Sequence, residues 1–268
     1  MAFSKEELSR YSRHFVLPEI GVKGQKKLLS SSVLVIGAGA LGSASLMYLA
    51  AAGVGRIGIA DFDRVELSNL QRQIIHNTES VGEYKTESAK RTLGAINPGA
   101  EVITVDKRLD ADNIIPVIAD YDFILDCTDR FSTKFLINDA CVIAKKPYSH
   151  AGVIKFGGQS LTYVPGEGPC LRCILGAPPK DEGLTCSAAG VLGAATGLMG
   201  CVQASEAIKY ITGVGELLTG KIFSFDLLTL KFKVYEGFSP SDECRACRAK
   251  DGAFLKENRA EYEDDCEG

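Results

Sequence analysis

The chain has 268 residues, 46% of them hydrophobic and 24% charged, which is typical of a globular protein with a sizeable buried core. Its 30 basic and 34 acidic residues give a net charge of -4 with no basic stripe, which excludes nucleic acid as an expected partner. The N-terminus lacks the apolar segment of a signal peptide, and glycines interrupt the uncharged run 183–205. We therefore expect a cytoplasmic protein, with this run forming a buried, closely packed helix and not a membrane span.

The first 30 residues predict a helical arm, with one helix over 4–12 and a second over 22–30. Strands and helices then alternate, which predicts a doubly wound, Rossmann-like and mostly parallel sheet. The expected strands are 33–36, 56–60, 102–105 and 123–126, and the expected helices are 41–52, 83–96, 111–119 and 133–144.

The pattern changes after residue 147. Glycines punctuate two strand-like runs, 148–153 and 159–164, which predict a hairpin where the sheet turns antiparallel. The glycine-rich helix extends to about residue 211, and strands are expected at 222–225 and 232–235. We expect a single domain over 1–250, followed by an acidic and disordered tail over 251–268.

A glycine-rich turn follows the first strand. Gly37, Gly39 and Gly42 have the spacing that permits a tight turn, close approach of the backbone to phosphate, and packing of the next helix on the strand. Asp61 ends the next apolar run, about 20 residues further on, where an acid reaches ribose hydroxyls. This motif predicts a nucleotide site and leaves open a dinucleotide or a mononucleotide.

Charged residues follow two of the expected strands. Arg72 and Lys85 come after the second strand and Asp129 after the fourth, so all three lie near the carboxyl edge of a parallel sheet. Arginine and lysine bind phosphate oxygens, and one carboxylate together with substrate phosphates is a usual magnesium site. The set favours a nucleoside triphosphate over a nicotinamide cofactor, with solvated surface charges as the alternative.

Four of the nine cysteines form two Cys-x-x-Cys pairs: Cys170 with Cys173, and Cys244 with Cys247. Four thiolates are a complete tetrahedral ligand set for zinc, with no open position, so such a site would be structural. Four unrelated thiols, or two redox dithiols, are the alternatives.

The chain resembles the adenylating enzymes MoeB and ThiF, bacterial relatives of the ubiquitin-activating enzymes. The resemblance extends to about Arg248 and includes both cysteine pairs. Its motifs are Arg10-Tyr11-Ser12-Arg13, Gly37-Ala38-Gly39-Ala40-Leu41-Gly42, Asp61-Phe62-Asp63, Leu67-Ser68-Asn69-Leu70-Gln71-Arg72-Gln73, Gly82 with Lys85, and Leu125-Asp126-Cys127-Thr128-Asp129.

The resemblance implies roles for these residues. ATP would bind at the glycine turn, with its ribose on Asp61, its phosphates on Arg72 and Lys85, and Mg²⁺ on Asp129. Arg13 would reach the phosphates from the other subunit of a homodimer, and Cys186 would be a reactive thiol. The remaining implied nucleotide-site residues are Ala40, Asp63, Asn69 and Gln73, and the implied zinc ligands are Cys170, Cys173, Cys244 and Cys247.

The implied reaction is adenylation of the C-terminal glycine carboxylate of a small ubiquitin-like sulfur carrier ending in Gly-Gly, of the ThiS or MoaD type. It would serve thiamine or molybdenum-cofactor biosynthesis, with a sulfur donor as a further partner. Residues 31–146 would form the nucleotide-binding half and 147–250 the carrier-binding and zinc half. The alternatives are an NAD-dependent oxidoreductase, a non-catalytic carrier-binding module, and an enzyme that adenylates another peptide or a tRNA carboxylate.

Overall fold

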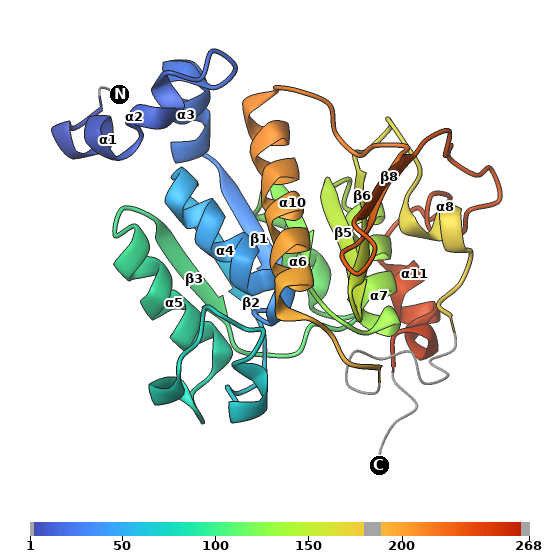
Figure 1. The fold of residues 1–268 in the computed structure, drawn as a ribbon. Helices are drawn as coiled ribbons and strands as arrows, with labels where there is room; N and C mark the ends of the chain where they lie inside the picture. Colours follow the sequence, from blue (N-terminus) through green and yellow to red (C-terminus); the bar gives the residue numbers. More distant parts are fainter. Residues whose placement is uncertain (1–2, 180–188, 264–268) are drawn as a thin grey trace.

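The computed structural model describes residues 3–179 and 189–263. They form one eight-stranded sheet in the order β3-β2-β1-β4-β5-β6-β7-β8 (Figure 1). Strands β1 to β5 pair in parallel, and β6, β7 and β8 add antiparallel, so the predicted sheet and its change of direction are confirmed. The strands are β1 Ser32–Ile36, β2 Arg56–Ala60, β3 Glu101–Val105, β4 Phe123–Asp126, β5 Tyr148–Ile154, β6 Gly157–Tyr163, β7 Ile222–Asp226 and β8 Lys231–Tyr235.

Helices cover both faces of the sheet (Figure 1). Residues of α3, α4, α5 and α10 share one apolar core with one face, and residues of α6, α7, α8 and α11 share a second core with the other face. The helices are α1 Lys5–Arg10, α2 Ser12–Phe15, α3 Gly21–Leu29, α4 Ala40–Ala52, α5 Lys85–Ile96, α6 Ile114–Ala119, α7 Phe131–Ile143, α8 Leu171–Leu175, α10 Gly193–Thr212 and α11 Ala253–Glu257.

The N-terminal arm differs from the single helix expected over 4–12. It contains α1, which Ser4 and Glu7 cap as predicted, and then the separate α2. The break falls at Tyr11, whose backbone leaves the helical region so that its ring is buried against Gly53. Asn97 Nδ2 donates to the Tyr11 hydroxyl at 2.9 Å, which fixes the arm to the domain.

From residue 193 on, the glycine-rich run forms α10, a closely packed helix as predicted, and its packing partner is α4. A Cβ on Gly200 would lie 2.5 Å from the carbonyl oxygen of Leu41, so only glycine permits this approach of the two helices. Ser45 Oγ donates to the Gly200 carbonyl oxygen at 3.1 Å. Over the described ranges, we find no helix with the length and hydropathy that crossing a bilayer requires.

The expected disordered tail is wrong for residues 253–262. They form α11 and a short 3-10 helix, and Leu255 and Tyr262 are buried in the second core. The Tyr262 hydroxyl donates to Asp139 at 2.7 Å, while Glu261 pairs with Arg172 at 2.9 Å. The acidic composition of the tail led to the prediction of disorder, although Leu255 and Tyr262 can be buried. Residues 264–268 lie outside the described part.

Candidate functional site: a nucleotide-type cavity and a four-cysteine cluster

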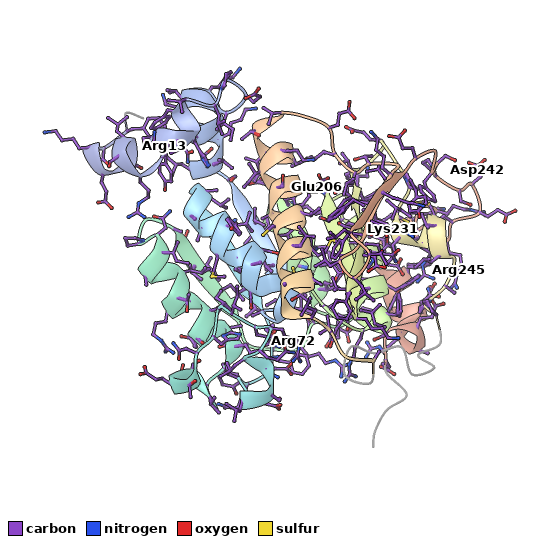
Figure 2. All side chains as sticks on the ribbon, viewed as in Figure 1. Arg13, Arg72, Glu206, Lys231, Asp242 and Arg245 are labelled. Atoms are coloured by element: carbon purple, nitrogen blue, oxygen red, sulfur yellow. The ribbon has the colours of Figure 1, made fainter. Side chains whose placement is uncertain are left out.

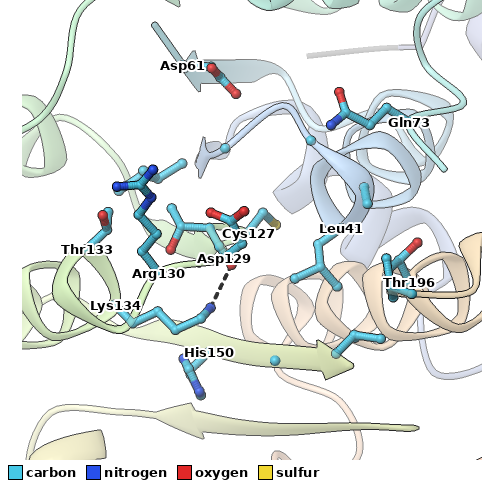
Figure 3. A pocket seen from close by; sticks show the side chains of 18 of the residues that line it. Leu41, Asp61, Gln73, Cys127, Asp129, Arg130, Thr133, Lys134, His150 and Thr196 are labelled. Atoms are coloured by element: carbon cyan, nitrogen blue, oxygen red, sulfur yellow. Dashed lines mark hydrogen bonds between the residues drawn. The ribbon is translucent and has the colours of Figure 1, made fainter. Parts of the chain in front are cut away.

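A cavity of about 910 Å³ opens at the carboxyl ends of the parallel strands. It lies where the strand order reverses between β1 and β4, the usual ligand position in doubly wound sheets. Residues from the glycine turn, from the loops after β2, β3 and β4, and from β5, β6 and β7 line it. Figure 3 shows Asp61 and Gln73 above the turn that carries Asp129, with Lys134 and His150 below.

The glycine turn has the geometry that its sequence predicts. Gly37 has a φ of +99°, and a Cβ there would lie 2.6 Å from the carbonyl oxygen of Cys127. Gly42 packs against the turn itself, since its Cβ would lie 2.0 Å from the Gly37 carbonyl oxygen. Gly39 and Ala40 line the cavity, so Gly42 shapes the turn while its neighbours are exposed to a ligand.

Asp61 and Lys85 lie in this cavity as expected. Asp61 accepts hydrogen bonds from the backbone N–H groups of Ala38 at 2.8 Å and Asp63 at 2.9 Å, which hold it beside the glycine turn. Burial raises its pKa, and the charge of Lys85 opposes that rise. Lys85 Nζ pairs with Asp63 Oδ2 at 2.7 Å, so a phosphate that binds Lys85 would compete with this carboxylate for the ammonium group or share the ammonium group with it.

Three residues of the segment 67–73, which follows β2, are predicted to bind the nucleotide, and two of them line the cavity. Arg72 and Gln73 line the cavity, and Arg72 Nη1 donates to the Ser68 carbonyl oxygen at 3.0 Å. The buried Gln73 Oε1 has no hydrogen-bond partner in the described structure, which leaves one acceptor for a ligand. Asn69 does not line the cavity, because its Oδ1 accepts from Glu66 N and caps a 3-10 turn.

Asp129 lies on the turn between β4 and α7 and lines the cavity. Its carboxylate is exposed and has no ion-pair or hydrogen-bond partner in 3–179 and 189–263. The buried Asp126 accepts from Thr128 Oγ1 at 2.7 Å. Lys134 Nζ donates to the Thr128 carbonyl oxygen at 2.8 Å, the dashed line in Figure 3. These contacts fix the turn that presents Asp129.

Burial opposes ionisation of Asp126, but the nearby Lys134 ammonium and a hydrogen bond from His150 outweigh it. They hold the pKa of Asp126 at about 2. His150 Nδ1 lies 2.7 Å from Asp126 Oδ2, and burial together with the charge of Lys134 lowers the pKa of His150. The carboxylate is therefore ionised and the imidazole neutral near pH 7.

Four cations in the cavity lining were not singled out from the sequence: Lys107, Arg108, Arg130 and Lys134. Lys107 and Arg108 follow β3, so the strand-end argument that identified Arg72 and Asp129 would also have found them. Arg130 follows Asp129 directly. Lys134 lies on α7, and which face of this helix borders the cavity is not evident from the sequence.

The predicted Arg13 does not line the cavity of this chain. Arg13 is exposed on α2 in the N-terminal arm, away from Arg72 (Figure 2). Cys186 lies outside the described residues, so its role stays a prediction.

The two Cys-x-x-Cys pairs meet in space, with the sulfur atoms of all four within 4.8 Å of one another. Cys170 Sγ lies 3.7 Å from Cys173, Cys244 and Cys247, and Cys173 Sγ lies 3.6 Å from Cys247 Sγ. A tetrahedral zinc with Zn–S bonds of about 2.3 Å places its sulfurs about 3.8 Å apart. The quartet therefore fits zinc, and its separations are too long for disulfides.

Comparison with known proteins agrees with this geometry. The model of the ThiF family matches residues 11–246. The chain is 43% identical over 248 residues to "Adenylyltransferase and sulfurtransferase MOCS3" of Drosophila sechellia, with 92% of this chain and 55% of that protein covered. It is 44% identical over 245 residues to the Aedes aegypti protein of the same name, with 91% and 56% covered. The chain thus spans about half the length of these curated relatives.

Solved structures of E. coli MccB have the same fold. The MccB structure with ATP gives a TM-score of 0.77 at 25% identity, with 91% of this chain and 75% of that chain covered. The MccB structure with succinimide gives 0.78 at 26% identity, with 89% and 74% covered. The match over residues 11–246 and the identity with the MOCS3 proteins show that the chain belongs to the ThiF family.

Proposed function

We propose that this protein is an adenylyltransferase. It would bind ATP in the cavity and activate the C-terminal glycine carboxylate of a small ubiquitin-like sulfur carrier ending in Gly-Gly, releasing pyrophosphate. The observation that carries the proposal is the cavity itself. It is lined by a glycine turn, by Asp61 as the ribose-binding acid, by the cations Arg72 and Lys85, and by Asp129, which has no partner among the residues that the structure describes. The names of the MOCS3 relatives and the ATP complex of MccB support it.

The chemistry requires alignment and charge compensation. An ionised carboxylate is already a nucleophile, so its attack on the α-phosphorus of ATP needs no general base. Arg72 and Lys85 would stabilise the charge that develops on the phosphate oxygens and on the departing pyrophosphate. Asp129 is the residue that would hold Mg²⁺, which supplies further neutralisation of phosphate charge when bound. The proposed nucleotide contacts also include Gly37, Gly39, Ala40, Asp63 and Gln73. Gly42 would act by shaping the turn, and Asn69, which caps a 3-10 turn and does not line the cavity, is not among the proposed contacts.

An exposed apolar surface beside the cavity supports a protein substrate. Leu228, Leu230 and Phe232 on and before β8 are 71%, 74% and 52% exposed. The Phe232 ring stacks on Phe225 at 6.2 Å between centroids, and the buried Phe225 lines the cavity. A carrier protein that docks on β8 could therefore extend its C-terminal tail directly into the site.

The other assignments complete the proposal. Cys170, Cys173, Cys244 and Cys247 would bind a structural zinc ion, and Arg13 would complete the site of a partner subunit in a homodimer. Cys186 would form a covalent bond to the carrier or accept sulfur from a donor. The family's reaction and reduced cysteines suit the cytoplasm.

ATP–pyrophosphate exchange with a panel of purified carriers tests the function. We expect exchange only with carriers ending in Gly-Gly, and none when the same carrier lacks its last two residues. Thiamine-type, molybdopterin-type and free peptide substrates in the panel identify the pathway. If no substrate supports exchange and the protein instead binds NADH without protection by ATP in a thermal shift, the oxidoreductase alternative replaces the proposal.

A further inference from the structure

His76 is a buried histidine that lies beside the cavity without lining it, 6% exposed. Its Nε2 lies 2.9 Å from the carbonyl oxygen of Ala38 in the glycine turn, and its Nδ1 lies 2.9 Å from Ser88 Oγ on α5. A carbonyl oxygen only accepts, so Nε2 carries the proton and donates to Ala38. In the neutral ring Nδ1 then accepts from the Ser88 hydroxyl.

These contacts connect three segments that contain residues proposed to bind the nucleotide. The first is the glycine turn. The second is α5, whose first residue is Lys85. The third is the loop with Arg72 and Gln73, to which His76 itself belongs and where its N–H donates to the Gln73 carbonyl oxygen at 3.1 Å.

The two peptide groups on either side of the Ala38 Cα are each held by a side chain. Asp61 Oδ2 accepts from the Ala38 N–H at 2.8 Å, and His76 donates to the Ala38 carbonyl oxygen at 2.9 Å. The first bond is to Asp61, a residue of the proposed ribose site. The second comes from His76, which does not line the cavity. The carbonyl that His76 holds shares its peptide group with the N–H of Gly39, a residue that lines the cavity. Because backbone N–H groups of such a turn approach phosphate closely, a small rotation of the Ala38–Gly39 peptide would misplace this N–H.

We propose that His76 is a positioning residue for ATP, which orients the glycine turn relative to Lys85 and Arg72. The inference rests on the proposed adenylation and adds a residue that acts through the turn without contact to substrate. Removing the side chain should weaken ATP binding selectively. The carrier-facing side of the cavity, formed by β5, β6 and β7, should be unchanged.

The test compares His76→Leu, His76→Gln and Ser88→Ala in ATP–pyrophosphate exchange. For His76→Leu we expect KM for ATP to rise by about tenfold and KM for the carrier to stay within twofold, because the displaced backbone N–H groups of the glycine turn would bind the phosphates of ATP less well. His76→Gln retains an N–H donor and should recover much of the loss. Ser88→Ala should have a smaller effect in the same direction, and the double variant His76→Leu/Ser88→Ala should be less impaired than the sum of the two.

Thr92→Val is the matched control. Thr92 Oγ1 donates to the Ile75 carbonyl oxygen at 2.7 Å, so it links the same loop to the same helix without reaching the glycine turn. It should lower Tm slightly and leave KM for ATP unchanged. If His76→Leu folds and keeps the wild-type KM for ATP, or if Thr92→Val raises that KM equally, His76 has only a structural role.

Should His76→Leu fail to fold, Ser88→Ala decides by the same KM comparison: a raised KM for ATP supports the role of His76, and an unchanged one rejects it. Wild-type protein in the same assay separates the two proposals. Exchange by wild type with unchanged variants rejects only the role of His76, whereas absence of exchange by wild type rejects the adenylation itself.

Discussion

Asp129 offers an exposed carboxylate at the cavity, and no residue of the described structure pairs with it. Asp129→Ala should therefore abolish ATP–pyrophosphate exchange while shifting the free energy of unfolding by less than about 0.5 kcal/mol, as for other surface changes. Exchange assays and urea unfolding of the same preparations measure both quantities. Wild-type exchange by a purified Asp129→Ala protein would show that this carboxylate takes no part in the reaction.

Two buried histidines predict how stability depends on pH. Burial lowers the pKa of both His76 and His150 in the folded protein, so the unfolded chain binds more protons as pH falls below about 6.5. The free energy of unfolding should therefore fall between pH 7.5 and 5.5, by at most about 1.4 kcal/mol per pH unit for each histidine. Asp126, with a pKa of about 2, stays ionised throughout this range.

Urea unfolding of wild type and His76→Gln at several pH values checks this slope. The variant should lose less stability on acidification, since it lacks one of the two groups that must remain neutral in the fold. Identical slopes for the two proteins would mean that His76 takes up a proton in the folded state as readily as in the unfolded chain.

At the scale of elements, two glycines of α10, Gly197 and Gly200, allow a matched test of its packing on α4. Gly200→Ala would place a Cβ 2.5 Å from the Leu41 carbonyl oxygen, so we expect destabilisation of about 1–3 kcal/mol from overpacking against α4. A Cβ on Gly197 meets no atom within 4 Å, so Gly197→Ala should stabilise α10 by up to about 1 kcal/mol through helix propensity. Thermal unfolding of both variants measures the difference, and equal effects would contradict the close packing of α10 on α4.

The cysteine cluster predicts one zinc ion per chain. Elemental analysis of purified protein should find it, and a strong chelator should lower Tm by several degrees because the site joins α8 to the chain after β8. Adding zinc back should restore Tm. Cys247→Ser should weaken zinc binding, and Cys247 does not line the cavity. If the metal-free protein keeps the full Tm, the cluster does not hold a structural ion.

Elements were predictable where a local pattern decides them. The parallel strands and the glycine turn follow from apolar runs and glycine spacing, and the strand-end rule located Asp61, Lys85 and Asp129. Asn69 could not be assigned from its motif alone, since its side chain caps a turn. Residues 253–262 are ordered in part because the Tyr262 hydroxyl bonds to Asp139. These two residues are far apart in the sequence, so a local sequence pattern cannot reveal the contact.

At the scale of the whole molecule, Arg13 lies on an arm outside its own cavity. If a partner's site uses it, Arg13→Ala and Asp129→Ala proteins, each inactive alone, should recover activity when they are mixed and allowed to exchange subunits. In a symmetric dimer one of the two sites in each mixed pair is intact, so roughly a quarter of wild-type activity is expected at equal amounts. Analytical ultracentrifugation verifies the dimer, and a mixture that stays inactive despite subunit exchange would place Arg13 outside the reaction.

The two cysteine pairs are about 70 residues apart in the sequence yet share one tetrahedral cluster. The two cysteines of each pair are close in the sequence, but the four-sulfur site exists only after α10, β7 and β8, which lie between the pairs, have assembled on the sheet. High-affinity zinc capture should therefore be a late event in folding, and the rate at which a refolding chain takes up metal would report directly on completion of the native topology.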